Sequence, residues 1–127
     1  MSVLGHGIDL VECERVANVF DRHGERFLAR VLTLPERELA ARPRDPIQFI
    51  SGRWAAKEAI LKMTGTGWRG QIKWTDIEIL PGGLGQPEVS LTGETARIAA
   101  DKGIVRVMLS ITHTKQYAAA SAIGVDR

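Results

Sequence analysis

The longest periodic pattern of apolar residues in the chain runs from Asp45 to Met63 and predicts a helix. One stripe of this helix consists of the large side chains of Ile47, Ile50, Trp54 and Leu61. The opposite side is also mainly apolar and carries Phe49, Ala56, Ala59, Ile60 and Met63. We therefore expect this helix to be buried almost all round. Pro46 suits its first position, Asp45 the cap before it, and Gly65 its end.

The pattern before this helix predicts one strand and three short helices. The strand contains Gly5 and Gly7, which allow close approach of another backbone. Gly24 separates the first two helices, and the capping box from Thr33 to Glu36 opens the third, which ends before Pro43. The expected bounds are 3–11 for the strand, and 12–23, 25–32 and 34–42 for the helices.

After the central helix, a glycine-rich loop over 65–71 leads into a region of strands. The predicted strands are 76–80, 88–91, 105–112 and 117–125, with one helix over 95–102. Clustered helices and hairpin-connected strands favour an α+β fold rather than alternating strand–helix units. We expect one domain over 1–127, with an antiparallel sheet packed against the long central helix and the shorter helices.

Composition narrows the class of protein without naming a function. A chain of 127 residues with 44% apolar content is typical of one globular domain. No run reaches the roughly 18 to 20 apolar residues of a membrane span, and the N-terminus does not resemble a signal peptide. A net charge of only +2 argues against nucleic acid as a partner. The single cysteine, Cys13, is expected as a buried residue in a reducing cytoplasm.

The central helix carries Glu58 and Lys62 one turn apart. A carboxylate on a buried helix needs a cation, a metal or hydrogen-bond donors nearby, because otherwise it takes up a proton. The alternative is a surface ion pair worth about 0.3–0.5 kcal/mol. The surrounding apolar residues count against that alternative.

Two other polar positions interrupt apolar segments. Asp9 lies in the first strand, where it could also end the strand or cap the next helix. His113 closes the strongly apolar strand before the last one, in the segment from Ser110 to Thr114, and a histidine there is often structural. Each signal is weak when it is taken alone.

Arginines recur at helical spacing in the first two predicted helices, at Arg15, Arg22, Arg26 and Arg30. One reading is a solvated face with the neighbouring acids Glu12, Glu14, Asp21 and Glu25 as partners. The other is a docking surface for an acidic partner.

Together these segments resemble the short bacterial class of 4'-phosphopantetheinyl transferases, the holo-(acyl-carrier-protein) synthases. Gly7-Ile8-Asp9 is similar to the first motif of that superfamily. Gly52-Arg53-Trp54-Ala55-Ala56-Lys57-Glu58-Ala59 with Lys62 is similar to its W/F-x-x-K-E-A-x-x-K motif. Gly65-Thr66-Gly67 and Ser110-Ile111-Thr112-His113-Thr114 are similar to segments of the short class. The resemblance runs from end to end.

The resemblance implies transfer of the phosphopantetheine arm of coenzyme A to a serine of an apo acyl carrier protein, as fatty acid biosynthesis requires. Asp9 and Glu58 would bind Mg²⁺, with water and diphosphate oxygens as further ligands. Lys62 would bind the transferred phosphate, and His113 would donate to a diphosphate oxygen. The base that deprotonates the serine stays open between Lys62, Glu58 and a metal-bound water.

The resemblance also implies which residues contact the two substrates. The expected coenzyme A contacts are Arg53, Lys57, Lys62, Gly65, Thr66, Gly67, His113 and Thr114. The expected docking residues for the acidic carrier protein are Arg15, Arg22 and Arg26, with Phe20 or Phe27 as apolar anchors.

The short class is typically a homotrimer, and we therefore expect His113 of one protomer to complete the Asp9 and Glu58 site of its neighbour. Two alternatives stay open. One is a non-catalytic trimeric module that binds acidic partners or RNA. The other is a transferase that serves the carrier proteins of polyketide or peptide synthetases.

Overall fold

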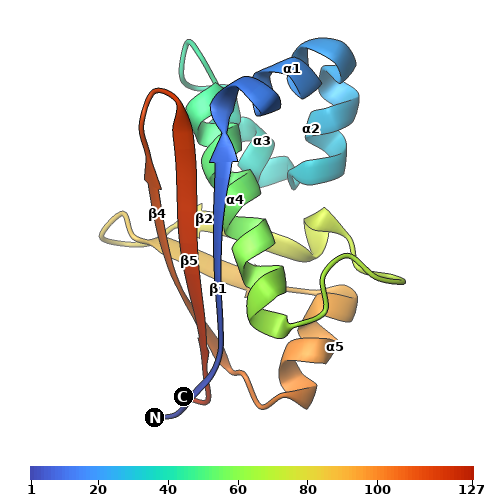
Figure 1. The fold of residues 1–127 in the computed structure, drawn as a ribbon, viewed down its shortest axis with the longest axis vertical. Helices are drawn as coiled ribbons and strands as arrows, with labels where there is room; N and C mark the ends of the chain where they lie inside the picture. The colour runs from blue at the N-terminus through green and yellow to red at the C-terminus, as the bar shows by residue number, and fades with distance from the viewer.

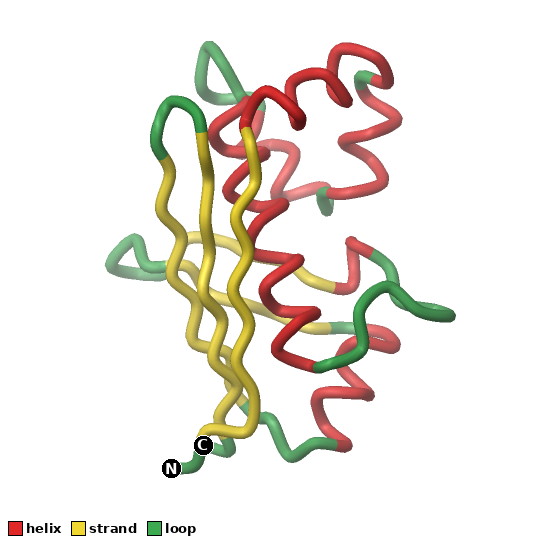
Figure 2. The backbone as a smooth tube through the Cα atoms, in the orientation of Figure 1, coloured by secondary structure: helices red, strands yellow, loops and turns green.

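A computed structural model describes all residues, 1–127. Two antiparallel sheets form the β part of the molecule (Figures 1 and 2). The larger sheet has the order β1-β5-β4, and the smaller pairs β2 with β3 and runs crosswise to it. The strands are β1 (Val3–Glu12), β2 (Ile77–Pro81), β3 (Pro87–Leu91), β4 (Arg106–His113) and β5 (Tyr117–Val125). Together with the helices, these sheets confirm the α+β prediction.

Helix α4 (Ile47–Thr64) lies against one face of the larger sheet (Figure 1). Ala55, Ala56 and Ala59 on this helix are fully buried. The close packing depends on glycine, because a side chain at Gly7 would collide with the carbonyl of Ala59. The prediction that glycine in the first strand allows close backbone approach is therefore confirmed.

The remaining helices lie at the two ends of α4. Three pack together at one end: α1 (Cys13–His23), α2 (Glu25–Val31) and α3 (Leu34–Ala40). Helix α5 (Gly93–Asp101) and the short 3₁₀ helix η1 (Trp74–Asp76) lie toward the other end and on the side of the smaller sheet. The chain ends are adjacent, and the Ser2 backbone N–H donates to Asp126 Oδ1 at 2.7 Å.

Local sequence signals fix most of the element boundaries. The capping box is confirmed, since Thr33 N–H donates to Glu36 Oε1 and Glu36 N–H to Thr33 Oγ1. Helix α4 begins at Ile47, one residue after the expected Pro46, and its first N–H donates to Asp45 Oδ1 at 3.0 Å. Gly65 ends the helix with a φ of 81°, in the left-handed region that favours glycine.

Most element boundaries differ from the sequence prediction by one or two residues, and two of these differences lie beside the smaller sheet. Asp76 belongs to η1 rather than to the following strand, because its carboxylate accepts from Lys73 N–H and turns the backbone. Helix α5 begins at Gly93, two residues before the expected Thr95. None of the helices is both long and apolar enough to cross a membrane.

Candidate functional site

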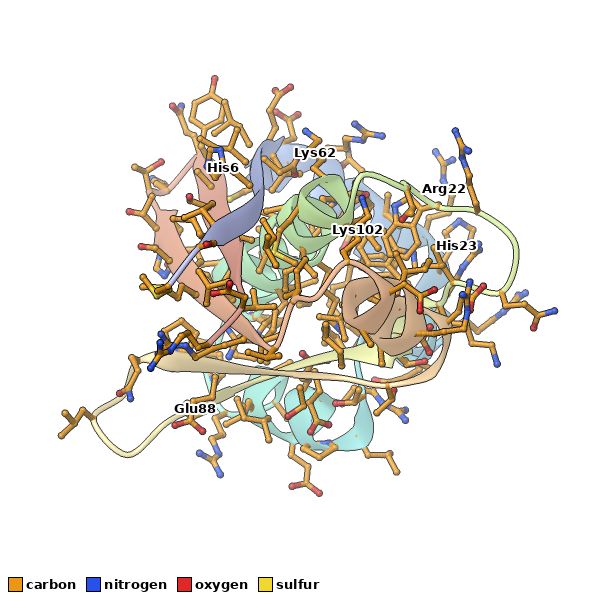
Figure 3. The ribbon with its side chains drawn as sticks, turned by 90° about the horizontal axis from the view of Figure 1, so that it is seen from below. His6, Arg22, His23, Lys62, Glu88 and Lys102 are labelled. Atoms are coloured by element: carbon orange, nitrogen blue, oxygen red, sulfur yellow. The ribbon has the colours of Figure 1, made fainter.

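Strand β1 and helix α4 bring Asp9 and Lys62 together. Lys62 Nζ lies 3.1 Å from Asp9 Oδ1 and donates to the Ile8 carbonyl at 3.1 Å. The Asp9 side chain is 16% exposed and that of Lys62 is 55% exposed, so the pair faces solvent on the lysine side. Figure 3 shows Lys62 beside β1 at the end of α4. This ammonium group is available to a phosphate as a point charge.

Glu58 lies one helical turn before Lys62 and is half-buried. Its Oε1 accepts a hydrogen bond from the indole Nε1 of Trp68 at 3.0 Å. Its neighbour Ala59 touches Gly7 of β1, two residues before Asp9. Asp9 and Lys62 are thus in direct contact, and Glu58 lies on the neighbouring turn of α4, so that a common site for all three stays a prediction.

The carboxylate oxygens of Asp9 and Glu58 are of the kind that binds Mg²⁺. Asp9 Oδ2 and Glu58 Oε2 make no hydrogen bond with the protein, so each carboxylate has an oxygen to offer. No group of three or more His, Cys, Asp or Glu side chains is arranged so that it could hold a metal ion. Mg²⁺ commonly takes one or two carboxylates and fills its octahedron with water and substrate phosphates, and this is the arrangement that two carboxylates allow.

Arg53 and His113 line a different cavity, of about 230 Å³, on the β4 side of α4. Arg53 Nε donates to the Ile79 carbonyl at 3.2 Å, and its guanidinium lies 4.4 Å from the centre of the Phe49 ring. The terminal nitrogens make no hydrogen bond with the protein. Burial lowers the pKa of Arg53, and the nearby Glu36 carboxylate opposes that effect.

Local contacts hold the end of β4 in place. Thr114 forms the turn between β4 and β5, where its Oγ1 accepts from the backbone N–H groups of Gln116 and Tyr117. Gln48 of α4 donates to the Thr114 carbonyl at 3.1 Å. These contacts fix His113, which is exposed, at the rim of the Arg53 cavity.

Sheet register separates His113 from Asp9 within one chain. Asp9 pairs with Ala120 of β5, which in turn pairs with Ile111 of β4. His113 lies two residues beyond Ile111, so strand geometry puts it roughly 12 Å from Asp9 across the sheet. Arg53 and Glu58 are five residues apart on α4, which turns them about 140° away from each other. One chain thus carries two separate half-sites. The Asp9 half-site consists of Asp9, Glu58 and Lys62, and the other consists of Arg53 and His113.

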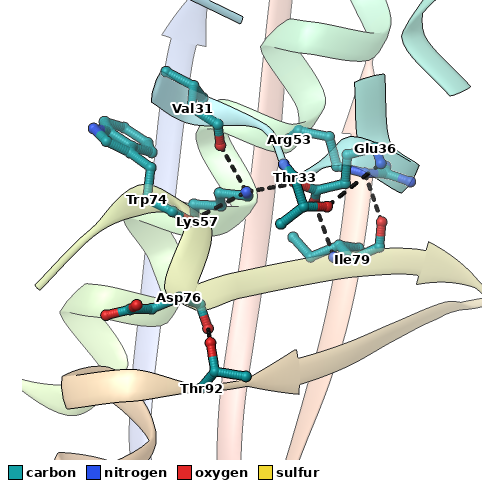
Figure 4. Close-up of polar contacts among 9 residues, drawn as sticks. All are labelled: Val31, Thr33, Glu36, Arg53, Lys57, Trp74, Asp76, Ile79 and Thr92. Carbon is teal, nitrogen blue, oxygen red and sulfur yellow. Dashed lines mark hydrogen bonds and ion pairs between the residues drawn. The ribbon is translucent and has the colours of Figure 1, made fainter. Parts of the chain in front are cut away.

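The expected contact between Lys57 and coenzyme A is corrected by the structure (Figure 4). Lys57 is fully buried, and its Nζ donates to Glu36 Oε1 at 2.7 Å, to the Val31 carbonyl at 2.7 Å and to the Trp74 carbonyl at 3.2 Å. Its three N–H donors are all used. Burial lowers the pKa of Lys57, and the Glu36 carboxylate opposes that effect. The lysine links three parts of the core and has no donor for a nucleotide.

The loop after α4 follows the Lys62 end of the helix. Gly65 and Gly67 both have positive φ, at 81° and 64°. Thr66 Oγ1 lies 3.0 Å from Thr64 Oγ1, which anchors the start of the loop to the helix. Lys102 Nζ approaches Gly65, where an added Cβ would lie 3.2 Å from it. The backbone of residues 65–67 is exposed near the Asp9 half-site and stays a predicted contact.

The predicted docking arginines are exposed on the outer side of α1 and α2. Arg15, Arg22 and Arg26 form no ion pair with the neighbouring acids. Arg22 projects away from the body of the molecule (Figure 3). Arg15 and Arg22 line one groove of about 310 Å³. Glu12 and Glu14 line the same groove without pairing to these arginines, so the docking surface stays a prediction.

The prediction that Phe27 is an exposed apolar anchor for the carrier protein is wrong. The Phe27 side chain is only 7% exposed and packs on Trp54 with ring centres 5.6 Å apart. The helical periodicity of α2 turns it into the core rather than toward solvent. Phe20, the alternative anchor, is partly buried at the surface of the core.

Sequence reasoning missed Trp68 and Phe49 as parts of the site. Trp68 reaches Glu58 from the loop, and Phe49 supports Arg53. A tryptophan within a glycine-rich polar loop was the available signal for Trp68. Phe49 was interpreted only as part of the apolar helix.

Comparison with known proteins defines the class. Residues 5–122 match the family described as the 4'-phosphopantetheinyl transferase superfamily. The chain is 43% identical to a holo-(acyl-carrier-protein) synthase of Desulforudis audaxviator, over 97% of this chain and 93% of that protein. A crystal structure of the Neisseria meningitidis holo-(acyl-carrier-protein) synthase has a TM-score of 0.89 at 30% identity, covering 98% of this chain and 99% of that one.

A third similar protein was solved with a nucleotide. The Bacillus anthracis holo-(acyl-carrier-protein) synthase in complex with CoA (3',5'-ADP) has a TM-score of 0.80 at 31% identity, and the match covers 96% of each chain. The chain belongs to the 4'-phosphopantetheinyl transferase superfamily. Within that superfamily its relatives are holo-(acyl-carrier-protein) synthases, matched over nearly their whole length.

Proposed function

We propose that this chain transfers the 4'-phosphopantetheine group of coenzyme A to a serine of apo acyl carrier protein. The observation that carries the proposal is the pairing of Lys62 with Asp9, one helical turn from Glu58 and within the residues that match the superfamily. The chemistry is a displacement at phosphorus. The serine oxygen bonds to the pantetheine-linked phosphorus, the diphosphate P–O bond breaks, and adenosine 3',5'-bisphosphate leaves with the electron pair.

Mg²⁺, when it is bound, supplies positive charge for the diphosphate and for the leaving group. Asp9 and Glu58 are the residues proposed to hold it. Lys62 is placed to bind the transferred phosphate, since its ammonium group is half exposed beside Asp9. The serine proton would go to Glu58, or to Lys62 if that lysine is neutral rather than bound to the phosphate as an ammonium group.

The Arg53 cavity is the proposed site for the nucleotide end of coenzyme A. Arg53 keeps its terminal nitrogens free, and His113 adds a ring nitrogen at the rim, so both can donate to phosphate oxygens. The Phe49 ring gives the cavity an apolar wall. Arg53 and His113 thus stay in the expected contact set, Phe49 is added to it, and Lys57 is removed.

Because the two half-sites lie on opposite sides of α4, one coenzyme A molecule is proposed to bridge two protomers. His113 and Arg53 of one protomer would face Asp9, Glu58 and Lys62 of the next. Such a head-to-tail contact closes into a ring under cyclic symmetry, and we propose a homotrimer.

The outer face of the larger sheet supports the assembly. Its outward side chains include Ile8 and Leu10, which are 61% and 66% exposed, and Met108 and Tyr117, each 44% exposed. A soluble monomer rarely leaves such an apolar face uncovered. A second and a third copy of the chain would cover it.

The exposed arginines of α1 and α2 are the proposed docking surface for the acidic carrier protein. Reversing both Arg15 and Arg22 to Glu should raise KM for the carrier protein about ten-fold or more, because like charges then face each other. KM for coenzyme A should stay unchanged, since neither residue lies at the half-sites. Steady-state kinetics with each substrate varied in turn measures both values.

The matched control for this charge reversal is Arg127→Glu, at the chain end far from α1 (Figure 1). It should leave both KM values unchanged. An unaltered KM for carrier protein in the double variant contradicts docking on α1.

The direct test of the activity is incubation with coenzyme A, Mg²⁺ and apo acyl carrier protein, followed by intact mass. The carrier protein should gain the mass of one phosphopantetheine group, and omission of Mg²⁺ should abolish the gain. A carrier protein of unchanged mass under all conditions contradicts the proposed activity.

A binding module for acidic partners would explain the arginines but not the Asp9 half-site. Coenzyme A with Mg²⁺ should raise the midpoint of thermal unfolding of an enzyme, whereas a binding module should show no such shift. The apo carrier of fatty acid biosynthesis, in the cytoplasm, is the proposed partner. Carriers of polyketide or peptide synthetases are the comparison substrates for the same mass assay.

A further inference from the structure

Trp68 is held in place by an aromatic stack although it lies in a loop. Its ring packs on Trp74 with centres 4.1 Å apart, and Trp74 packs on Trp54 at 5.4 Å. Trp54 in turn packs on the buried Phe27. These four rings come from α2, α4, η1 and the loop, and they connect Trp68 to the core.

The loop around Trp68 has few other anchors. Gly65, Gly67 and Gly70 all have positive φ, and a Cβ added at Gly67 or Gly70 would meet nothing within 4 Å. Trp68 itself is 37% exposed, so burial of its ring is incomplete. The ring stack and one hydrogen bond therefore determine where this side chain lies.

That hydrogen bond is directed at the proposed metal ligand. Trp68 Nε1 donates to Glu58 Oε1 at 3.0 Å, while Glu58 Oε2 stays free of the protein. An indole N–H is only ever a donor, so this hydrogen bond orients the carboxylate. Carboxylates that bind metals are commonly held in this way, and loss of the supporting partner typically lowers metal affinity about 10- to 100-fold.

We propose that Trp68 is a positioning residue that orients the Glu58 carboxylate for Mg²⁺. The inference rests on the proposed function, in which Glu58 is a metal ligand. Trp68 touches neither substrate in this role and acts only through Glu58. The stacked rings hold the Trp68 side chain in one position, and its indole N–H orients the Glu58 carboxylate.

The test compares Mg²⁺ affinity in full-length variants. The midpoint of thermal unfolding is followed against Mg²⁺ concentration at a saturating, fixed concentration of coenzyme A. Trp68→Phe keeps a ring for stacking on Trp74 but lacks the N–H donor. The matched control is Trp54→Phe, which changes a ring in the same stack but removes no hydrogen bond to Glu58.

Trp68→Phe should raise the Mg²⁺ concentration that gives half of the maximal rise in unfolding midpoint about ten-fold or more. Its unfolding midpoint without Mg²⁺ should stay within about 3 °C of the wild type, because a partly exposed side chain contributes little to stability. Excess Mg²⁺ should restore most of kcat. Trp54→Phe should leave the Mg²⁺ dependence unchanged, whatever it does to stability.

The inference is overturned if Trp68→Phe needs no more Mg²⁺ than the wild type for half of the maximal rise in unfolding midpoint. The proposed function would then stay intact. The same holds if Trp54→Phe shifts the Mg²⁺ dependence as much as Trp68→Phe does. If the wild type shows no Mg²⁺ dependence, or if Glu58→Gln keeps it, the metal assignment fails and the inference fails with it.

Discussion

Glu58→Gln should lower kcat about a thousand-fold or more, while the fold stays intact. Glutamine keeps the size of the side chain and can still accept from Trp68 Nε1, so packing is preserved. The negative charge that holds Mg²⁺ is lost, and a bound metal contributes several kcal/mol to stabilising charge in a phosphoryl transition state. Initial rates of carrier-protein modification measure the loss.

A second measurement separates this effect from unfolding. The unfolding midpoint of Glu58→Gln without ligands should match the wild type, but its increase with coenzyme A and Mg²⁺ should disappear. Glu88→Gln, an exposed change on β3, is the matched control and should retain both activity and the increase. Substantial activity in Glu58→Gln would mean that this carboxylate is not a metal ligand.

Lys57→Met should have its largest effect on stability. Removing the lysine leaves the Glu36 carboxylate charged and fully buried, with only the N–H groups of Thr33 and Ile79 as partners. Breaking a buried ion pair in this way costs about 3–5 kcal/mol. The midpoint of thermal unfolding should fall by roughly 10 °C or more for a chain of this size.

Lys62→Met is the matched control, because it removes a second lysine of the same motif from the same helix. The Lys62 side chain is 55% exposed and pairs with Asp9 near the surface, so its loss should cost about 1 kcal/mol or less. Activity should nevertheless be lost. A Lys57→Met variant that keeps its stability and instead raises KM for coenzyme A would contradict the structural role of Lys57.

Local physical chemistry explains why the elements were predictable. The capping box at Thr33 and the stop at Gly65 depend on residues within four positions of each other. Alternation in the last strand places Ala118, Ala120 and Ala122 in the core, and its predicted bounds agree with β5. The contact between Asp9 and Lys62 agrees with the resemblance, because the two motifs lie on adjacent, closely packed elements, whereas the role of Glu58 beside them stays a prediction.

Tertiary contacts explain why the roles of Lys57 and Phe27 were predicted wrongly from the sequence. Lys57 looks like a neighbour of Glu58 in the motif, but its partner Glu36 is 21 positions away in the chain. Phe27 looks like an exposed anchor until Trp54 is seen to cover it. Spacing along a chain does not show which distant residue supplies a partner, so exposure was misjudged at both positions.

The place of β5 between β1 and β4 gives the molecule its division into two half-sites. The sequence gives no indication of this order, because the strands that carry Asp9 and His113 could also have been neighbours. The intervening strand moves His113 out of reach of its own Asp9. The proposed site shared between protomers would bring both sets of residues to one coenzyme A molecule.

The most direct test of this account is subunit mixing. His113→Ala and Glu58→Ala chains are unfolded together, refolded at equal amounts, and assayed for modification of apo acyl carrier protein. Each variant alone should be nearly inactive. In a randomly mixed ring, about one quarter of the clefts combine an intact Glu58 with an intact His113, so about one quarter of wild-type activity should return. A co-assembled mixture no more active than either variant alone would contradict the shared site.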